Sequence, residues 1–402
     1  MEPDAAPGTP FLRVGLLYVA GLCAAAQFAK VSVIFETLRA VYPGAGVEIG
    51  FLVSLLSLVG IVFGLVAGLV VARLGFRRLL LAALAAGALI SLYQSTLPPL
   101  PLMLLSRAIE GAAHLAIVVA APTLITVISA KRHHPVVMTV WSTYFGTAFA
   151  LAAWVGLPLA AQWGPGALFQ LHAGLLALVA LLLAVALPRE AVATTAGKLS
   201  LATVLRRHVE VYTSPTLAAP AAGFGFYALT YVSLLTLLPE HIAPEWRTLV
   251  TGMLPLASIA ASLVSGATLL RRFRAVTVSI AGFGLGAVLS VLLIAFPGDP
   301  ALCIALFVAL GLMQGASFAA IPELNARPAD QALANGALAQ TGNMGNTLGT
   351  PVLFALGSSG GFPALIGLVA LAHATGGLIH FGLARRRDRA VQAVRSPGRD
   401  VD

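Results

Sequence analysis

The stretch "GLVVARLGFRR", residues 68–78, places three arginines within a few positions of each other between two long apolar runs. Only 10% of the chain is charged. In so apolar a chain, clustered arginines are typical of points where the polypeptide leaves a lipid bilayer. The stretch therefore predicts a short basic loop joining two membrane-crossing helices.

The composition excludes a water-soluble fold. Of the 402 residues, 59% are hydrophobic, and the mean hydropathy is +0.94. Soluble domains are about 45–50% apolar and about 25% charged. A bilayer requires apolar helices of about 20 residues whose backbone groups are paired within the helix. The lipid bilayer is thus the expected surroundings of this chain.

The charge and the cysteines exclude several other classes. The net charge of +9 comes in short bursts between apolar segments, whereas a nucleic-acid binder gathers its basic residues on one face or arm. Cys23 and Cys303 lie far apart in apolar runs, with neither disulfide nor zinc spacing. We find no catalytic triad, phosphate loop or metal-ligand cluster, and we expect neither enzyme activity nor a cofactor.

Turn residues and charges divide the chain into twelve apolar runs. They predict an all-α integral membrane protein, with twelve transmembrane helices in two pseudo-symmetric six-helix bundles. The predicted domains are a first bundle at 1–187, a linker at 188–214, a second bundle at 215–385 and a basic tail at 386–402. The predicted crossings are 12–38, 47–72, 78–96, 99–128, 135–160, 166–187, 215–238, 248–270, 275–296, 300–321, 332–357 and 362–384.

The Lys and Arg residues predict the orientation. With both termini in the cytoplasm, all but four of the 24 lie on the cytoplasmic side, as positive loops do. Arg39 and Arg247 fall outside, and Lys30 and Arg107 fall within crossings. The first ten residues contain no Lys or Arg, unlike the basic start of a secretory signal. We therefore expect the first apolar run to be kept as a membrane helix.

The two halves of the chain repeat each other. "GLVVAR" (68–73) ends the second crossing, and "GATLLR" (266–271) ends the second crossing of the other half. Likewise "IEGAAHLA" (109–116) matches "MQGASFAA" (313–320), so that Glu110-Gly111 aligns with Gln314-Gly315. An internal repeat of six crossings is typical of transporters that alternate access around a central site.

These motifs resemble the major facilitator superfamily. Its loop between crossings 2 and 3 reads Gly-x-x-x-Asp-Arg-x-Gly-x-Arg/Lys-Arg/Lys, and its crossing 4 often carries Arg-x-x-Gln-Gly. This chain has Arg107, Glu110 and Gly111 in crossing 4, and Ala72 where the loop usually has Asp. The loop positions that match are Gly68, Arg73, Gly75, Arg77 and Arg78.

The resemblance implies a secondary transporter in the inner membrane of a bacterial cell. In it, Gly68 would let helices pack closely, and Arg73, Arg77 and Arg78 would latch one access state as gating residues. Alternatively, these arginines only follow the positive-inside rule. The missing Asp at Ala72 removes one expected partner of the latch.

Ionisable residues inside crossings are costly and point to function. Lys30 follows Gln27 by one turn in crossing 1, and Arg107, Glu110 and His114 share one face of crossing 4. The Arg107–Glu110 pair could bind substrate or exchange a proton, with His114 as relay. Alternatively, the pair only locks helices together, Lys30 reaches towards the membrane surface, and His114 bonds its own helix.

Aromatic and amide side chains are further candidates for substrate binding. Trp141 with Tyr144 in crossing 5, and Tyr227 with Tyr231 in crossing 7, share helix faces that the resemblance places beside a central cavity. There they could stack on a flat solute, or simply pack. Crossing 11 offers Gln340, Asn343 and Asn346 at three-residue spacing, suited to neutral ligands or to joining helices.

Three kinds of cargo remain open. We expect uptake of a small flat organic solute such as riboflavin, with protons as the coupling ion and the protein as a monomer. Drug–proton export is an alternative, although crossing 5 lacks the Gly-Pro pattern of exporters. The third is copper or other metal uptake, because 323–351 looks like a bacterial branch that imports copper or riboflavin. Copper(I) prefers sulfur and imidazole, yet the chain has no Met-x-x-x-Met, and its His134–Met138 pair lies in a loop.

Overall fold

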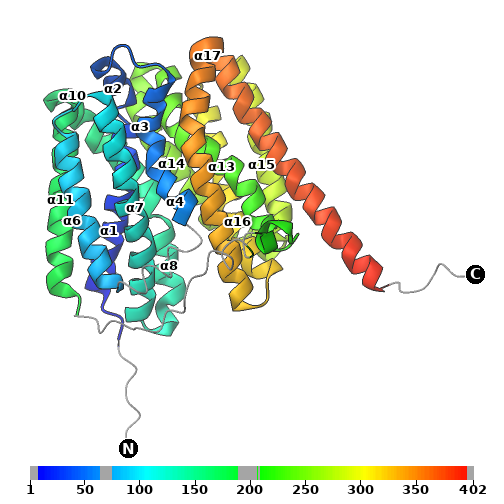
Figure 1. The fold of residues 1–402 in the computed structure, drawn as a ribbon. Coiled ribbons are helices and arrows are strands. Elements are labelled where there is room, and N and C mark those ends of the chain that lie inside the picture. Colours follow the sequence, from blue (N-terminus) through cyan, green and yellow to red (C-terminus); the bar gives the residue numbers. More distant parts are fainter. Residues whose placement is uncertain (1–7, 64–74, 189–205, 207–208, 396–402) are drawn as a thin grey trace, which may run out of the picture. The chain divides into compact units, whose positions relative to one another are not determined.

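The computed structural model describes residues 8–63, 75–188, 206 and 209–395. Within these ranges the regular elements are all helices, and no strand is found (Figure 1). Contacts divide the chain into two compact units. Unit 1 comprises Met1–Gly197 with Leu235–Leu256, and unit 2 comprises Lys198–Leu234 with Ala257–Asp402. The predicted boundaries of the two bundles and the linker stay a prediction. The contact-based units differ from them in one respect: Leu235–Leu256, from the second half of the chain, belongs to unit 1.

Four described helices of the first half are long, namely α1, α6, α7 and α11. Their long apolar sequences favour membrane helices, and α7 continues through Pro122. The elements in order are α1 (Phe11–Ser32), α2 (Phe35–Val41), η1 (Val47–Gly50), α3 (Phe51–Ser54), η2 (Leu55–Ser57), α4 (Leu58–Phe63), α6 (Phe76–Gln94), α7 (Leu100–Ile128), η3 (Lys131–His133), α8 (His134–Ser142), α9 (Tyr144–Leu151), η4 (Ala152–Gly156), α10 (Leu157–Trp163) and α11 (Pro165–Ala186).

The second half ends in one long helical element. α17 runs across two predicted crossings and changes direction at Gly361, whose φ of 69° only glycine adopts readily. The elements in order are α13 (Ala218–Leu237), η5 (Leu238–His241), α14 (Pro244–Ala267), η6 (Leu269–Arg271), α15 (Ala275–Ala295), α16 (Pro300–Leu324) and α17 (Pro328–Arg395).

The number of crossings agrees with the expected fold. Ten described helical segments are long and apolar enough to span a membrane, and Val47–Phe63 is a shorter apolar one. The segment Leu333–Arg389 is among the ten and contains the Gly361 break. If Leu333–Arg389 is counted as two crossings, the ten segments become eleven crossings. Val47–Phe63 belongs to one more crossing, which gives twelve. The all-α membrane fold is therefore confirmed.

One predicted crossing is less regular than expected. The run at 135–160 is divided among α8, α9, the π-helical turn η4 and α10. A π-turn inserts one extra residue into the helix, and Pro158 follows at the start of α10. Hydropathy gives the apolar length of a segment and does not register such local changes of pitch.

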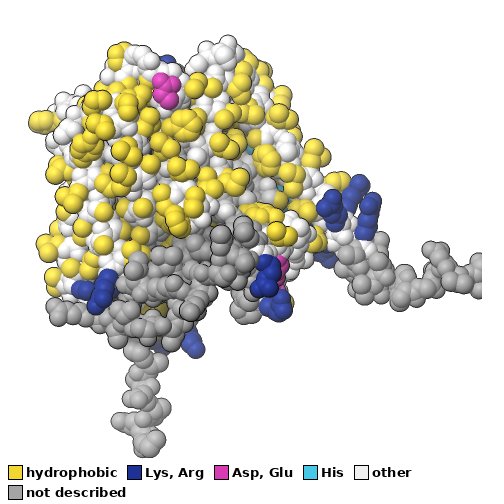
Figure 2. Space-filling view, in the orientation of Figure 1, with side chains coloured by type: hydrophobic (Ala, Val, Ile, Leu, Met, Phe, Trp, Pro, Cys, Tyr) yellow, Lys and Arg dark blue, Asp and Glu magenta, His cyan; other side chains and the backbone are white. Residues whose placement is uncertain are grey.

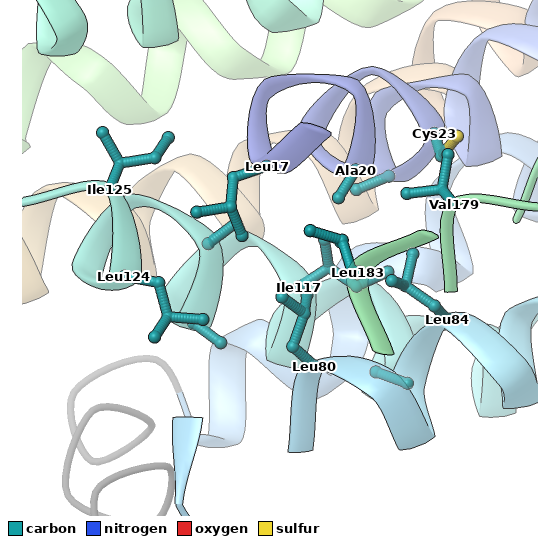
Figure 3. Packing of buried hydrophobic residues seen from close by; sticks show 14 of the residues in the cluster. Leu17, Ala20, Cys23, Leu80, Leu84, Ile117, Leu124, Ile125, Val179 and Leu183 are labelled. Carbon is teal, nitrogen blue, oxygen red and sulfur yellow. The ribbon is translucent and has the colours of Figure 1, made fainter. Parts of the chain in front are cut away.

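The core of unit 1 lies where α1, α6, α7 and α11 pack together (Figure 3). Leu17 on α1 and Ile117 on α7 are fully buried in it. Beside this core a Cβ on Gly111 would overlap the carbonyl oxygen of Leu56, so this glycine lets α7 touch the backbone of the preceding crossing. Close contact through small residues is typical of helices in lipid.

Unit 2 also has glycines where two helices touch. A Cβ on Gly315 of α16 would lie 2.8 Å from the hydroxyl of Ser262 on α14. Gly111 and Gly315 are the aligned positions of the internal repeat, and each contacts the second crossing of its own half. On α17, Gly345 and Gly349 lie directly against the backbone of α13.

Figure 2 shows hydrophobic side chains over most of the described surface in view, with Lys and Arg at its margins.

Candidate functional site

Four helices of unit 1 enclose a group of charged and polar side chains within the membrane-spanning region. α1 contributes Gln27 and Lys30, and α7 contributes Ser106, Arg107, Glu110 and His114. α6 contributes Ser91 and Gln94, and α11 contributes His172. Each of these side chains is at least nine-tenths buried. We call this group the buried ionic network.

Glu110 is the centre of the network. Its Oε1 accepts a hydrogen bond from Nζ of Lys30 at 2.8 Å, and its Oε2 accepts one from Nε2 of Gln94, also at 2.8 Å. The same Oε2 bonds with Nη1 of Arg107, one turn earlier on α7. One carboxylate therefore joins α1, α6 and α7.

Lys30 is surrounded by acceptors. Besides Glu110, its ammonium donates to Oγ of Ser91 at 2.9 Å and to Oε1 of Gln94 at 2.8 Å. Nδ1 of His172 lies 3.2 Å from Nζ. Because every neighbour can accept, the site suits a charged ammonium that has lost its water. Lys30 is 1% exposed and does not reach the membrane surface.

Arg107 ties the network to the backbone. Its Nε donates to the carbonyl oxygen of Leu52 at 2.6 Å, and its Nη2 donates to that of Gln27 at 2.8 Å. The guanidinium thereby uses its fork of donors on two further helical segments and Glu110. Such contacts fix the position of Arg107 more firmly than that of Lys30.

The two histidines of the network have definite tautomers. Nδ1 of His114 lies 3.1 Å from the carbonyl oxygen of Ala24 and 3.2 Å from Oε1 of Gln27, both of them acceptors, so Nδ1 carries the hydrogen. Nε2 of His172 donates to the carbonyl oxygen of Cys23 at 2.9 Å. Nδ1 of His172 therefore accepts, next to Lys30. His114 bonds α1 and not its own helix.

The charges in the network do not cancel. Lys30 and Arg107 bring two positive charges and Glu110 brings one negative charge. An uncompensated charge in a water-free interior costs several kcal/mol, and such residues in crossings are functional candidates by default. The arrangement leaves one positive charge to be balanced by an anion, by a proton leaving Lys30, or by the surroundings.

The gating motif is only partly described. Gly68, Ala72 and Arg73 lie outside the described residues. Gly75 has a φ of 84° and precedes α6. Nε of Arg77 donates to the carbonyl oxygen of Leu187 at 3.1 Å, and its Nη2 donates to that of Ala184 at 2.7 Å. Arg77 thus holds the end of α11, and Arg78 is exposed.

The aromatic candidates take part in packing. Trp141 stacks on Tyr144 with ring centroids 4.6 Å apart, and its ring covers Gly21 of α1. In unit 2, the rings of Tyr227 and Tyr231 lie 5.2 Å apart, and Tyr231 lies 5.4 Å from Phe307. These are rows of rings on helix faces; their predicted role in binding a solute remains a hypothesis.

The amide candidates lie on α17. Oε1 of Gln340 accepts a hydrogen bond from the hydroxyl of Tyr212 at 2.9 Å. Asn343 donates to the carbonyl oxygen of Ala339 at 2.8 Å, one turn earlier on its own helix, and Asn346 is half-buried. Gln340 and Asn343 thus bond to different partners, and the predicted role of the three amides in substrate binding remains a hypothesis.

The sequence profile of the Major Facilitator Superfamily matches residues 17–321. The chain belongs to the Major Facilitator Superfamily. No curated protein matches the sequence well enough to serve as a relative. Because the profile describes the superfamily as a whole, membership makes the chain a membrane transporter of small molecules, and it favours no copper- or riboflavin-importing branch.

Four members of the network in this facilitator are absent from the sequence-based candidates: Ser91, Gln94, Ser106 and His172. Gln94 and Ser91 stand three residues apart near the end of an apolar run, and His172 lies in the middle of another. The rule that singled out Lys30, namely a polar side chain inside an apolar run, would have found His172 as well. Their convergence on Lys30 needs the packing of α6 and α11, which the sequence does not show.

Proposed function

We propose that this facilitator is a secondary active importer of a small, flat organic solute such as riboflavin, working by alternating access and coupled to protons. We further propose that it lies in a bacterial inner membrane with both termini in the cytoplasm. The observation that carries the coupling proposal is the buried ionic network, in which two cations share one carboxylate.

The network supports coupling because its charge state can change. Glu110 has three donors, Lys30, Gln94 and Arg107, so protonating it would break the balance among three helices. Lys30 is the cation without backbone bonds, so its interaction with Glu110 is the one most readily exchanged. A change of one proton would then alter how α1, α6 and α7 are held together.

The organic cargo is supported by the aromatic rows. Tyr227 and Tyr231 offer two neighbouring rings on one face of α13, and rings of this kind stack on flat heterocycles. The phenol hydroxyls and the amides of α17 add hydrogen-bonding groups without charge. These features suit a neutral, planar solute better than a metal ion.

Growth of riboflavin-auxotrophic cells tests the cargo. Cells producing the chain should grow on riboflavin concentrations that do not support cells with an empty vector. Failure to rescue growth, together with increased copper content of the same cells, would replace the proposed cargo by copper. An immunoblot of the membrane fraction checks that the protein is produced. Absence of growth then means that the protein does not import riboflavin, and not that the protein is missing.

A further inference from the structure

Unit 2 contains two buried histidines that the transport proposal does not use. His373 and His380 lie two turns apart on α17 and both are 0% exposed. In the predicted crossings of the second half, 215–238, 248–270, 275–296, 300–321, 332–357 and 362–384, the sequence contains no Asp, Glu, Lys or Arg. These two imidazoles are therefore the only side chains in those crossings that titrate near neutral pH.

Phe283 of α15 lies between the two imidazoles. Its ring centroid is 6.2 Å from that of His373 and 5.6 Å from that of His380. Glycines make room on both sides: a Cβ on Gly286 would come within 2.8 Å of Nδ1 of His373, and a Cβ on Gly223 would overlap Nε2 of His380. An aromatic ring between two imidazoles can stabilise a positive charge on either of them.

The ring of His373 has one nitrogen engaged. Its Nε2 lies 3.0 Å from Oγ1 of Thr230, which donates its own hydrogen to the carbonyl oxygen of Tyr227. With Nε2 as the donor to Thr230, Nδ1 keeps its lone pair. Nδ1 lies beside the backbone of Gly286 and makes no hydrogen bond of normal geometry among the described residues.

His380 is bonded still less. Neither of its ring nitrogens has a hydrogen-bond partner within the described part of the chain. A buried polar group without a partner costs about 1–3 kcal/mol, and a neutral imidazole always has one N–H to satisfy. A buried histidine with both nitrogens unused is costly between apolar helices, and it points to an occupant that bonds the ring of His380.

A serine stands opposite His380. α15 and α17 are antiparallel, because Gly286 faces His373 and Phe283 faces Gly376. One turn further, the same register places Ser279 of α15 at the level of His380. Ser279 is fully buried, and its hydroxyl also lacks a hydrogen-bond partner among the described residues. Two facing helices thus present unsatisfied polar groups at one level.

We propose that His373, His380 and Ser279 form a proton-binding site inside unit 2, which takes up a proton together with the water that bonds it. The proton adds to the free lone pair of an imidazole, whose other nitrogen keeps its hydrogen, and no covalent bond breaks in the protein. The site is independent of riboflavin and of the buried ionic network.

Ser279 and His380 lie near one end of the helix pair α15 and α17. Ser279 is the fifth residue of α15, about 6 Å along the helix from its first residue, and Arg274 immediately precedes α15. His373 lies about 10 Å further along α17 than His380. Besides Arg274, the charged groups at this end of the two helices include Arg387, which donates to the carbonyl oxygen of Pro215 at 2.8 Å, and Glu323, which accepts from the backbone N–H of Ala275 at 2.8 Å.

The test is a pH titration of the full chain with ring-¹⁵N-labelled histidine, in nanodiscs, by NMR from about pH 8 to about pH 4. The signals are assigned by His373→Gln and His380→Gln. We expect both rings to change from the neutral to the imidazolium pattern. His172 is an internal control, because it is equally buried and both of its nitrogens are bonded; it should stay neutral until a lower pH.

A pair of serine variants tests the site without altering a histidine. Ser279→Ala should shift the midpoint of His380 and leave that of His373 in place. Ser290→Ala is the matched control on the same helix, because its hydroxyl donates to the carbonyl oxygen of Gly286, and it should not move His380. The proposal is overturned if His373 and His380 stay neutral to the pH at which His172 titrates, or if Ser279→Ala leaves His380 unchanged.

Discussion

At the scale of residues, the protein is distinguished by an unequal distribution of charge. Unit 1 buries Lys30, Arg107 and Glu110 in one network, whereas the crossings of unit 2 contain imidazoles and no carboxylate. Burying charges is costly unless each is paired, so the network is a place where single substitutions should have large effects. Those effects should depend strongly on which partner remains.

Removing Glu110 alone should destabilise the protein more than removing Lys30 alone or removing both. Glu110→Gln leaves two buried cations close together without a carboxylate and should lower stability by about 3–5 kcal/mol, the usual effect of an unpaired buried charge. Lys30→Met leaves Glu110 paired with Arg107 and bonded to Gln94, so no charge is left unpaired and the loss should be smaller, about 1–3 kcal/mol. The double variant should cost clearly less than the sum of the two, as measured by thermal unfolding of the purified protein in detergent.

Additive effects within about 0.5 kcal/mol would show that the two side chains do not interact energetically, contrary to the 2.8 Å contact between them. The matched control is Ser106→Ala, which removes a network hydroxyl without changing any charge and should cost about 1 kcal/mol.

Arg77 should matter more to stability than its neighbour Arg78. Arg77 donates to two carbonyl oxygens at the end of α11, where backbone acceptors lack partners within the helix. Arg77→Ala should cost about 1–2 kcal/mol, and Arg78→Ala, at an exposed position, less than about 0.5 kcal/mol. Equal melting temperatures for the two variants would contradict a capping role for Arg77.

At the scale of elements, glycines decide how closely helices approach. Gly349 of α17 lies against the carbonyl oxygen of Leu229, and no neighbour lies within 4 Å of a Cβ placed on Gly367 of the same helix. Gly349→Ala should therefore force α13 and α17 apart and lower the melting temperature. Gly367→Ala should be neutral or stabilising by up to about 1 kcal/mol, because alanine favours helix.

The two variants share the chemical change and lie in α17 on either side of Gly361, so a general effect of alanine in a membrane helix would move both melting temperatures in the same direction. Such a result would mean that α13 and α17 do not make the close contact seen between Gly349 and Leu229.

The sequence predicted the positions of the membrane-crossing helices better than the contacts between them. A bilayer imposes the length of each crossing, and this length is visible as an apolar run, so twelve crossings follow from hydropathy. The division of 135–160 by a π-turn and the change of direction at Gly361 within α17 depend on local backbone geometry. Likewise Lys30 stands out in the sequence, but its contacts with Ser91 and His172 depend on which helices become neighbours.

At the scale of the whole molecule, the two halves that repeat each other in sequence also make an equivalent helix contact. Gly111 and Gly315, aligned in the sequence, each contact the second crossing of their own half. The predicted topology has both termini and the linker at 188–214 on the same side of the membrane. Reporter fusions at residue 1 and within 188–214 should therefore report one compartment; opposite compartments would mean an odd number of crossings before the linker.

The central proposed property of the molecule is the coupling of solute movement to protons through the buried ionic network. Riboflavin uptake into proteoliposomes tests it, by comparing the wild-type protein with Glu110→Gln in two modes. The wild type should exchange riboflavin at equilibrium and also accumulate it when a proton gradient is imposed. Glu110→Gln should retain the exchange and lose the accumulation. Accumulation by Glu110→Gln at the wild-type level would contradict coupling through the network, and no exchange by the wild type would contradict riboflavin as the cargo.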